Sequence, residues 1–178
     1  MSQIKVNSIV PVGGLPAGAT AGGIIQTVTT VKKDKTSSAI ASGGVFDFTA
    51  FNVAITPTSN SSKILIMATI SVGYNSTMPF FMVLRVNGSD CTDAIGDASG
   101  SRIRSSMGGY QGHLGGVETI NLSFIHSPAS TSTQTYNLAF RHDSGSEKTV
   151  NINSSQYDND AATYPRTASS LIAMEMGV

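Results

Sequence analysis

The sequence predicts an all-β fold, an antiparallel β-sandwich of the jelly-roll kind with about eight strands and an extended N-terminal arm. Three observations predict it. From Gly23 onward, runs of about six to ten residues rich in Val, Ile, Thr and Phe are separated by clusters of Gly, Ser, Asn, Asp and Pro. Apolar and polar residues alternate within these runs, and no long window has the periodicity of an amphipathic helix. Evenly spaced strands with such turns favour a sandwich over a parallel sheet.

The first 23 residues depart from this pattern. They are rich in Gly and Pro and have no periodicity, so they cannot bury a core of their own. Ile4, Val6 and Ile9 nevertheless make the segment more apolar than a solvated tail. We therefore expect residues 1–23 to be an arm that docks against another protein through these three residues, and residues 24–178 to be the sandwich domain.

The clearest strand is predicted over residues 62–73. Its alternation places one set of side chains on a core face: Ile64, Ile66, Ala68, Ile70 and Val72. The opposite face is mixed, with Leu65, Met67, Thr69 and Ser71. This pattern predicts a central strand whose outer side has a subunit contact or partial cover.

The other strands are predicted over residues 24–33, 45–57, 79–88, 118–128, 133–145, 147–153 and 169–176. Their alternation predicts further core residues: Phe46, Phe48, Val53, Ile55, Phe80, Met82, Leu84, Val86, Ile120, Leu122, Phe124, Tyr136, Leu138 and Phe140. Asn87-Gly88 and Asp143-Ser144-Gly145 are hairpin signals, and residues 118–128 and 133–145 are predicted to be neighbouring strands. In the Gly-rich stretch 91–116 we expect a short strand near residues 101–106 and a long loop.

Composition and charge limit the function classes. Of the 178 residues, 12% are charged, about half the usual share for a soluble domain. Eleven basic and eleven acidic residues cancel, which argues against a nucleic-acid partner and favours a subunit that assembles with copies of itself. Cys91 is the only cysteine, so there is no disulfide framework. With no signal-peptide pattern and no long apolar run, we expect synthesis in a cytoplasm and no membrane insertion.

The residues that carry chemistry do not form a recognisable catalytic motif. A Ser/His/Asp triad could be drawn from His126 or His142 with Asp143, but no G-x-S-x-G elbow is present and serine is abundant. We expect both histidines to end strands and the protein not to be an enzyme.

No cofactor or metal site is predicted, and two weaker alternatives stay open. If His113 lay near the axis of a trimer, the three copies would bring three imidazoles together, which could bind a metal ion. Asp158, Asn159 and Asp160 offer oxygen ligands for calcium, but they lack the Gly and distal Glu of an EF-hand loop, so a solvated turn is favoured.

Several segments, in order and spacing, resemble the small tail-fibre-like virion proteins of marine bacteriophages, notably cyanophages. They are MSQIKVNSIV at the start, GGIIQTVTTVKKDKTSS, ITPTSNSSKILIMATISVG, GDASGSRIRSS, FIHSPASTSTQTYNLAFRHDSG and YPRTASSLIAMEM near the end. The resemblance spans nearly the whole chain, although each piece alone is of low specificity. It implies a homotrimeric β-rich virion protein, anchored to other virion proteins by its arm and with distal loops facing outward.

From this resemblance we expect a tail-fibre or fibre-like appendage subunit that contacts a host-surface glycan or protein. The loops at 74–78, 107–116 and 156–165 are expected to make outward contacts through Tyr74, Tyr110, His113, Tyr157 and Tyr164. Two alternatives remain at this point: a capsid decoration protein of the head-fibre or cement type, and a carbohydrate-binding β-sandwich module.

Overall fold

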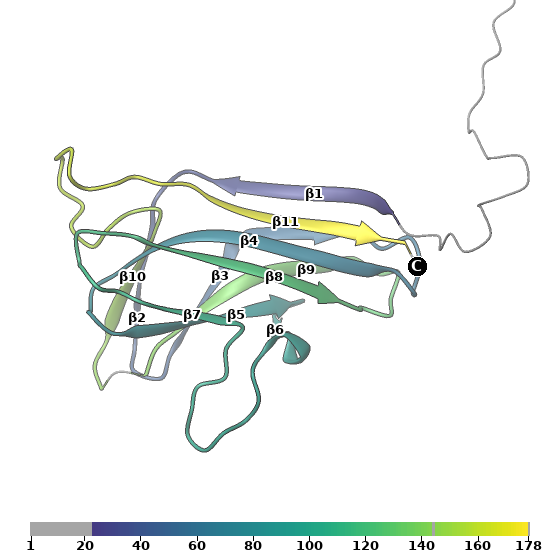
Figure 1. Cartoon of the computed structure of the whole chain (residues 1–178), viewed down its shortest axis with the longest axis horizontal. Coiled ribbons are helices and arrows are strands. Elements are labelled where there is room, and N and C mark those ends of the chain that lie inside the picture. Colours follow the sequence, from purple (N-terminus) through teal and green to yellow (C-terminus); the bar gives the residue numbers. More distant parts are fainter. Residues whose placement is uncertain (1–22, 144, 178) are drawn as a thin grey trace, which may run out of the picture.

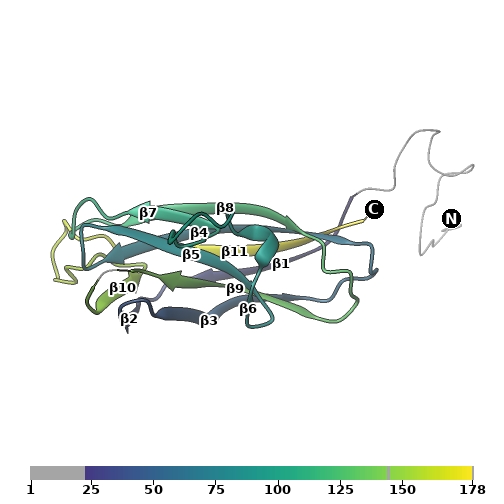
Figure 2. The ribbon, with the colours of Figure 1, turned by 90° about the horizontal axis from the view of Figure 1, so that it is seen from below.

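The computed structural model describes residues 23–143 and 145–177, which fold into two antiparallel sheets packed face to face (Figure 1, Figure 2). The predicted all-β sandwich is thus confirmed. The single helix among the described residues is a short 3₁₀ turn, Thr92–Ala94. The described part of the chain therefore has no helix long and apolar enough to cross a membrane. Most of the predicted arm, with Ile4, Val6 and Ile9, lies outside the described residues.

The first sheet is built around β4 (Lys63–Tyr74). One edge of β4 pairs with β8 (Glu118–His126). The other edge pairs first with β11 (Ser169–Met176) and then with β10 (Lys148–Ile152). The sheet continues from β11 to β1 (Ile24–Lys32) and from β10 to β2 (Thr36–Ile40).

The second sheet contains β3 (Val45–Ile55), β9 (Gln134–Arg141), β5 (Pro79–Val86), β6 (Ser89–Asp90) and β7 (Met107–Tyr110). The structure has eleven described strands where eight were predicted. The three additional strands, β2, β6 and β7, are short, so the alternation along them is too brief to predict a strand. The strand expected near residues 101–106 lies instead at β7, which pairs with β5. A Cβ atom on Gly109 would lie 2.6 Å from Cζ of Phe80, so the glycines of β7 make room for a core ring.

The core confirms the alternation predicted for β4. Ile64, Ile66, Ala68, Ile70 and Val72 are at most 3% exposed and face the second sheet. The alternation continues past Gly73, so Tyr74 is fully buried and its ring lies 5.4 Å from that of Phe140. The prediction that Tyr74 makes an outward loop contact is therefore wrong: it is the last inward-facing residue of the strand.

The turn predictions had mixed outcomes. Asn87 and Gly88 have φ values of 52° and 81°, as the predicted hairpin between β5 and β6 requires. The hairpin predicted at 143–145 is wrong, because β9 and β10 belong to different sheets. Strands β8 and β9 also belong to different sheets, so residues 127–133 cross the sandwich and the two strands are not hydrogen-bonded neighbours.

Strand β3 departs from simple alternation. Its register with β9 shifts between Asp47 and Asn52, which marks an irregularity of the β-bulge type. The irregularity turns both Phe48 and Phe51 inward, with their ring centroids 5.5 Å apart. The sequence pattern predicted Phe48 in the core and missed Phe51.

Candidate functional site

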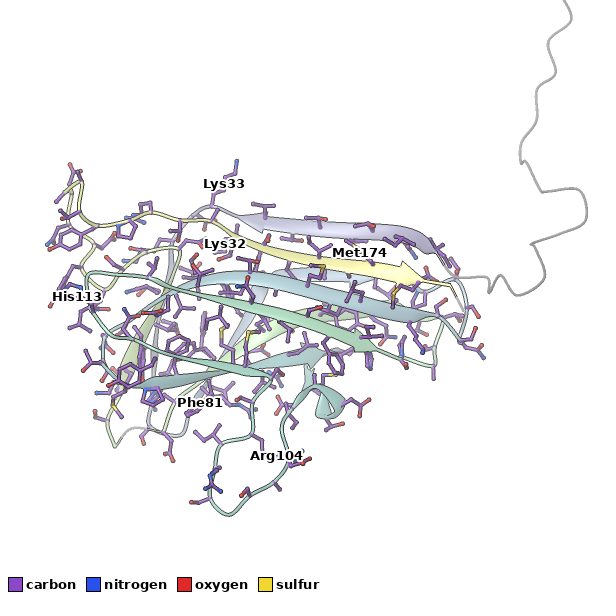
Figure 3. The ribbon with its side chains drawn as sticks, viewed as in Figure 1. Lys32, Lys33, Phe81, Arg104, His113 and Met174 are labelled. Atoms are coloured by element: carbon purple, nitrogen blue, oxygen red, sulfur yellow. The ribbon has the colours of Figure 1, made fainter. Side chains whose placement is uncertain are left out.

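The sandwich is elongated, and its two ends differ (Figure 1). At one end the backbone N–H of Gly177 donates to the carbonyl of Gly23, 3.0 Å away, so both described chain ends meet there. At the opposite end lie His113 and the connections around residues 75–78, 111–117 and 153–168 (Figure 3). We call this the far end. Three loops expected from sequence to make outward contacts therefore gather at one place, remote from Gly23.

Hydrogen bonds connect the far-end loops. The Tyr110 hydroxyl donates to the carbonyl of Thr77 at 2.9 Å. The backbone N–H of Gln156 donates to the carbonyl of Leu114 at 3.1 Å. These bonds join segments far apart in sequence, so the loops form one surface.

Three of the predicted contact residues form an aromatic patch at the far end: His113, Tyr157 and Tyr164. The two tyrosine rings meet edge to face, with centroids 5.8 Å apart. A Cβ atom on Gly115 would lie 2.9 Å from Cε1 of His113 and 3.2 Å from Cε1 of Tyr164, so both rings border this glycine. Tyr157 is 42% exposed, which leaves aromatic surface available for stacking on a ligand.

A pocket of about 320 Å³ adjoins the aromatic patch and is lined by residues 158–161, Tyr164 and Arg166. Of its two acidic residues, Asp158 pairs with Lys35 at 2.8 Å and with Arg166 at 2.5 Å. The hydrogen bond from Lys35 is the main cause that lowers the pKa of Asp158. These two cations already neutralise the Asp158 carboxylate, which disfavours calcium there, and the described part of the chain has no group of three His, Cys, Asp or Glu side chains that could hold a metal ion.

A second candidate surface covers the outer side of the first sheet. Three neighbouring rows of side chains run across its strands there, and none of these side chains is charged. We call this surface the outer face. Strand pairing aligns its residues in rows across β8, β4, β11 and β1: Ile125, Leu65, Met174 and Thr27; Ser123, Met67, Ile172 and Thr29; Asn121, Thr69, Ser170 and Val31. Ile125 is 50% exposed and Met67 41% exposed. Such an uncharged, partly apolar surface is typical of a protein contact.

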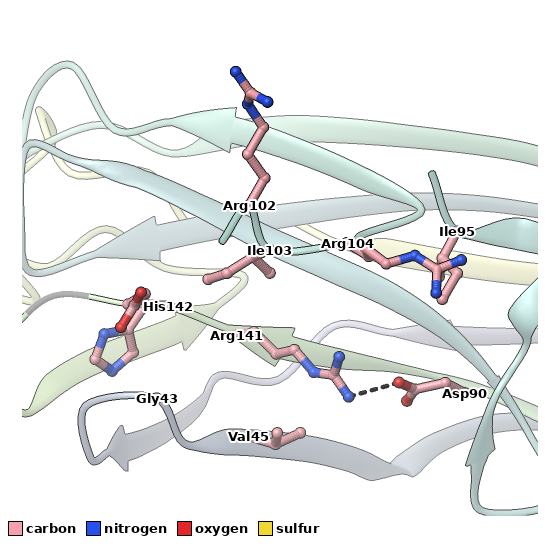
Figure 4. Close-up of a pocket in the computed structure, with 10 residues that line it drawn as sticks. Gly43, Val45, Asp90, Ile95, Arg102, Ile103, Arg104, Arg141 and His142 are labelled. Carbon is pink, nitrogen blue, oxygen red and sulfur yellow. Dashed lines mark hydrogen bonds and ion pairs between the residues drawn. The ribbon is translucent and has the colours of Figure 1, made fainter. Parts of the chain in front are cut away.

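A third surface lies on the outer side of the second sheet, where the loop 91–106 approaches the ends of β3 and β9. It encloses a pocket of about 560 Å³ lined by three arginines and two aspartates, among other residues (Figure 4). Arg141 pairs with Asp90 at 2.7 Å, and Arg85 pairs with both Asp90 and Asp47 beside the pocket. These residues come from segments distant in sequence and carry no motif, so no sequence pattern predicts this site.

Of the two histidines considered for catalysis, His126 ends β8 as predicted and His142 directly follows the last residue of β9, and each has a structural partner. His126 Nδ1 lies 2.8 Å from the hydroxyl of Tyr136, and burial lowers the pKa of the imidazole. His142 is buried, and its Nε2–H donates to the carbonyl of Ile40 at 2.8 Å. The histidines thus connect strands of the two sheets and are not brought together with each other.

Cys91 is 3% exposed, and burial raises the pKa of its thiol. A buried thiol of this kind packs like a small apolar residue. No protein-family model matches this chain, and no curated protein is significantly similar to it.

Proposed function

We propose that this protein is a structural subunit of a bacteriophage virion, a tail-fibre or fibre-like appendage that contacts the host surface. In this proposal the N-terminal arm docks on other virion proteins through Ile4, Val6 and Ile9. The far end carries the contact surface, and the subunit acts as a homotrimer without catalysis. Host contact then depends on several weak sites engaging together.

The observation that carries the proposal is the polarity of the sandwich. The segment that leads into β1 enters at Gly23, whereas the loops with Tyr110, His113, Tyr157 and Tyr164 lie at the opposite end (Figure 1). An appendage needs this arrangement, because its attachment point and its contact surface must lie apart.

The outer face supports the homotrimer. Twelve aligned side chains without a charge would favour a partner that is equally uncharged at the contact, and a second copy of this net-neutral chain meets that condition. Burial of Met67 and Ile125 between copies would remove their apolar surface from water.

The aromatic patch favours a glycan as the host molecule. The exposed ring of Tyr157 and the half-buried ring of Tyr164, beside a pocket with Asp, Asn and Arg side chains, combine stacking with hydrogen bonding, which sugars require. The same observation favours the second candidate, a carbohydrate-binding β-sandwich module. That candidate would bind sugar as a monomer, so the mass of the protein in solution distinguishes the two.

The arm is tested by producing particles with the chain lacking residues 1–20 and measuring its abundance in purified virions by mass spectrometry. We expect the truncated chain to fold but to be absent from the particles. Incorporation at the level of the full chain would contradict the docking role. The control is Lys33→Gln, an exposed change outside the arm, which should leave incorporation unchanged.

Host contact is tested with Tyr157→Ser, matched to Tyr110→Ser. Both tyrosines are exposed at the far end, but only Tyr157 belongs to the aromatic patch. We expect adsorption of particles to host cells to fall tenfold or more for Tyr157→Ser, because each binding site loses a stacking contact worth about 1 to 1.5 kcal/mol and several sites engage together. A larger loss for Tyr110→Ser would instead place the contact on β7.

A further inference from the structure

We propose that the pocket between the loop 91–106 and the ends of β3 and β9 binds an acidic sugar, with the carboxylate of the sugar on Arg104. We call it the arginine pocket. It lies on the second sheet, away from both the aromatic patch and the outer face, so this proposal does not depend on the proposed virion function.

One unpaired guanidinium in the arginine pocket favours an anion. Arg141 of the lining pairs with Asp90 at 2.7 Å and the Arg102 guanidinium points away (Figure 4), which leaves Arg104 to meet a charged ligand. A single negative group matches this one guanidinium. A carboxylate therefore fits better than a phosphate monoester, which carries nearly two negative charges at neutral pH.

Arg104 provides the binding fork. Its Nε donates to the carbonyl of Gly96 at 2.7 Å, which orients the side chain. No ion pair in the described part of the chain involves Arg104, so its two terminal nitrogens remain available for a carboxylate. Figure 4 shows the Arg104 side chain extending along the pocket above Arg141 and Asp90, while the guanidinium of Arg102 points away. Bidentate pairing with a planar guanidinium is the strongest contact available to a carboxylate here.

The remaining lining suits a polyol. Asp143 is exposed at the pocket and accepts hydrogen bonds, as sugar hydroxyls require. Ile95, Ile103 and Val45 provide an apolar wall for the C–H face of a sugar ring. His142 is the single aromatic ring in the lining, and it is buried, so the pocket offers no exposed platform for stacking a nucleobase. A volume of about 560 Å³ lies within the range of small-molecule sites.

The experiment is a titration of the full chain, with its isoleucine methyl groups labelled, against glucuronate, glucose and glucose 6-phosphate, followed by NMR. We expect glucuronate to shift the methyl signals of Ile95 and Ile103 with a dissociation constant in the millimolar range, and glucose to bind at least tenfold more weakly. The methyl signals of Ile125 and Ile172 on the outer face report binding elsewhere and should not shift. Equal affinity for glucose and glucuronate, or tighter binding of glucose 6-phosphate, would overturn the proposal.

Two variants with the same change in charge complete the test. Arg104→Gln removes the fork and should weaken glucuronate binding roughly tenfold or more. Arg102→Gln removes a guanidinium that points out of the pocket and should leave binding within about twofold, because solvent screens its charge. If both variants bind like the original chain, the site is wrong. Arg104→Lys guards against a folding defect: it keeps the charge, and we expect it to fold and to bind more weakly than the original chain.

Discussion

Glu175 is the buried residue whose charge matters most for the stability of this fold. It is fully buried in β11, and its carboxylate accepts hydrogen bonds from Gln26, Ser62 and the backbone and side chain of Thr58, at 2.6 to 2.7 Å. Burial alone would raise its pKa, but these bonds outweigh burial and lower the pKa to about 2. A charged carboxylate thus joins β1, β11 and the connection after β3.

Stability should therefore depend on pH through Glu175. Because the folded-state pKa lies below the ordinary value of 4.5, the stabilisation is complete above pH 4.5 and is lost as pH falls toward 2. This difference between the folded-state pKa and the ordinary pKa corresponds to about 3 kcal/mol in the free energy of unfolding. Urea unfolding at pH 7 and at pH 3, which lies between the two pKa values, should show about 2 kcal/mol of this loss. Glu175→Gln should be destabilised at pH 7 and lose less stability on acidification than the original chain, whereas Glu147→Gln, an exposed control, should follow the original chain.

Asn153 holds an unusual backbone conformation at the far end. Its φ is 65°, and its buried side chain donates to the carbonyls of Lys32 and Asp34 and accepts from Ser169. Asn153→Ala loses these bonds and keeps a Cβ at positive φ, whereas Asn153→Gly loses the bonds but also removes that Cβ. We expect the Asn153→Ala variant to have a free energy of unfolding about 1 kcal/mol lower than the Asn153→Gly variant, measured by urea unfolding. The reverse order would show that the backbone conformation carries no cost.

At the scale of elements, the passage of β4 beside residues 153–155 requires a glycine. A Cβ atom on Gly73 would lie 2.2 Å from the carbonyl oxygen of Ser154, a backbone atom that cannot rotate away. Gly73→Ala should cost about 2 to 3 kcal/mol of unfolding free energy or prevent folding. Gly112→Ala is the matched control, since nothing lies within 4 Å of its Cβ position, and it should change the midpoint of thermal unfolding little. Equal midpoints for the two variants would contradict the packing.

The strands were predictable from sequence where the determinant is local. Alternation along β4 fixes which side chains face the core, and Asn87-Gly88 fixes a tight turn by its own conformational preference. The partner of each strand is a non-local property. Residues 127–133 are as able to close a hairpin as to cross the sandwich, so alternation could not show that β8 and β9 lie in different sheets.

The candidate sites were predictable only in part for the same reason. The resemblance implies that three loops face outward, and those with Tyr110, His113, Tyr157 and Tyr164 meet at the far end. Tyr74 differs from its prediction because β4 continues one residue beyond the predicted strand end at Gly73. The arginine pocket unites residues from four segments of the chain, and the alternation of apolar residues contains no information about that meeting.

At the scale of the whole molecule, the outer face is the surface that the homotrimer proposal depends on. Met67→Glu places a charge among twelve uncharged side chains, so each copy would bury an unpaired carboxylate. We expect dissociation into monomers in sedimentation equilibrium without loss of the far-ultraviolet circular dichroism of the sheets. Val45→Glu is the control: Val45 is 47% exposed, similar to Met67, but lies on the second sheet. If Val45→Glu causes dissociation and Met67→Glu does not, the interface between copies lies on the second sheet, which would contradict the role of the outer face.

The measurement that tests the homotrimer most directly is the mass of the full-length chain in solution by sedimentation equilibrium over a wide range of concentration. The chain has a mass of 18.5 kDa. A trimeric appendage predicts a single species with three times that mass, which persists on dilution because an obligate assembly buries much of its apolar surface. A monomer of 18.5 kDa at all concentrations would contradict the homotrimer and favour the carbohydrate-binding module.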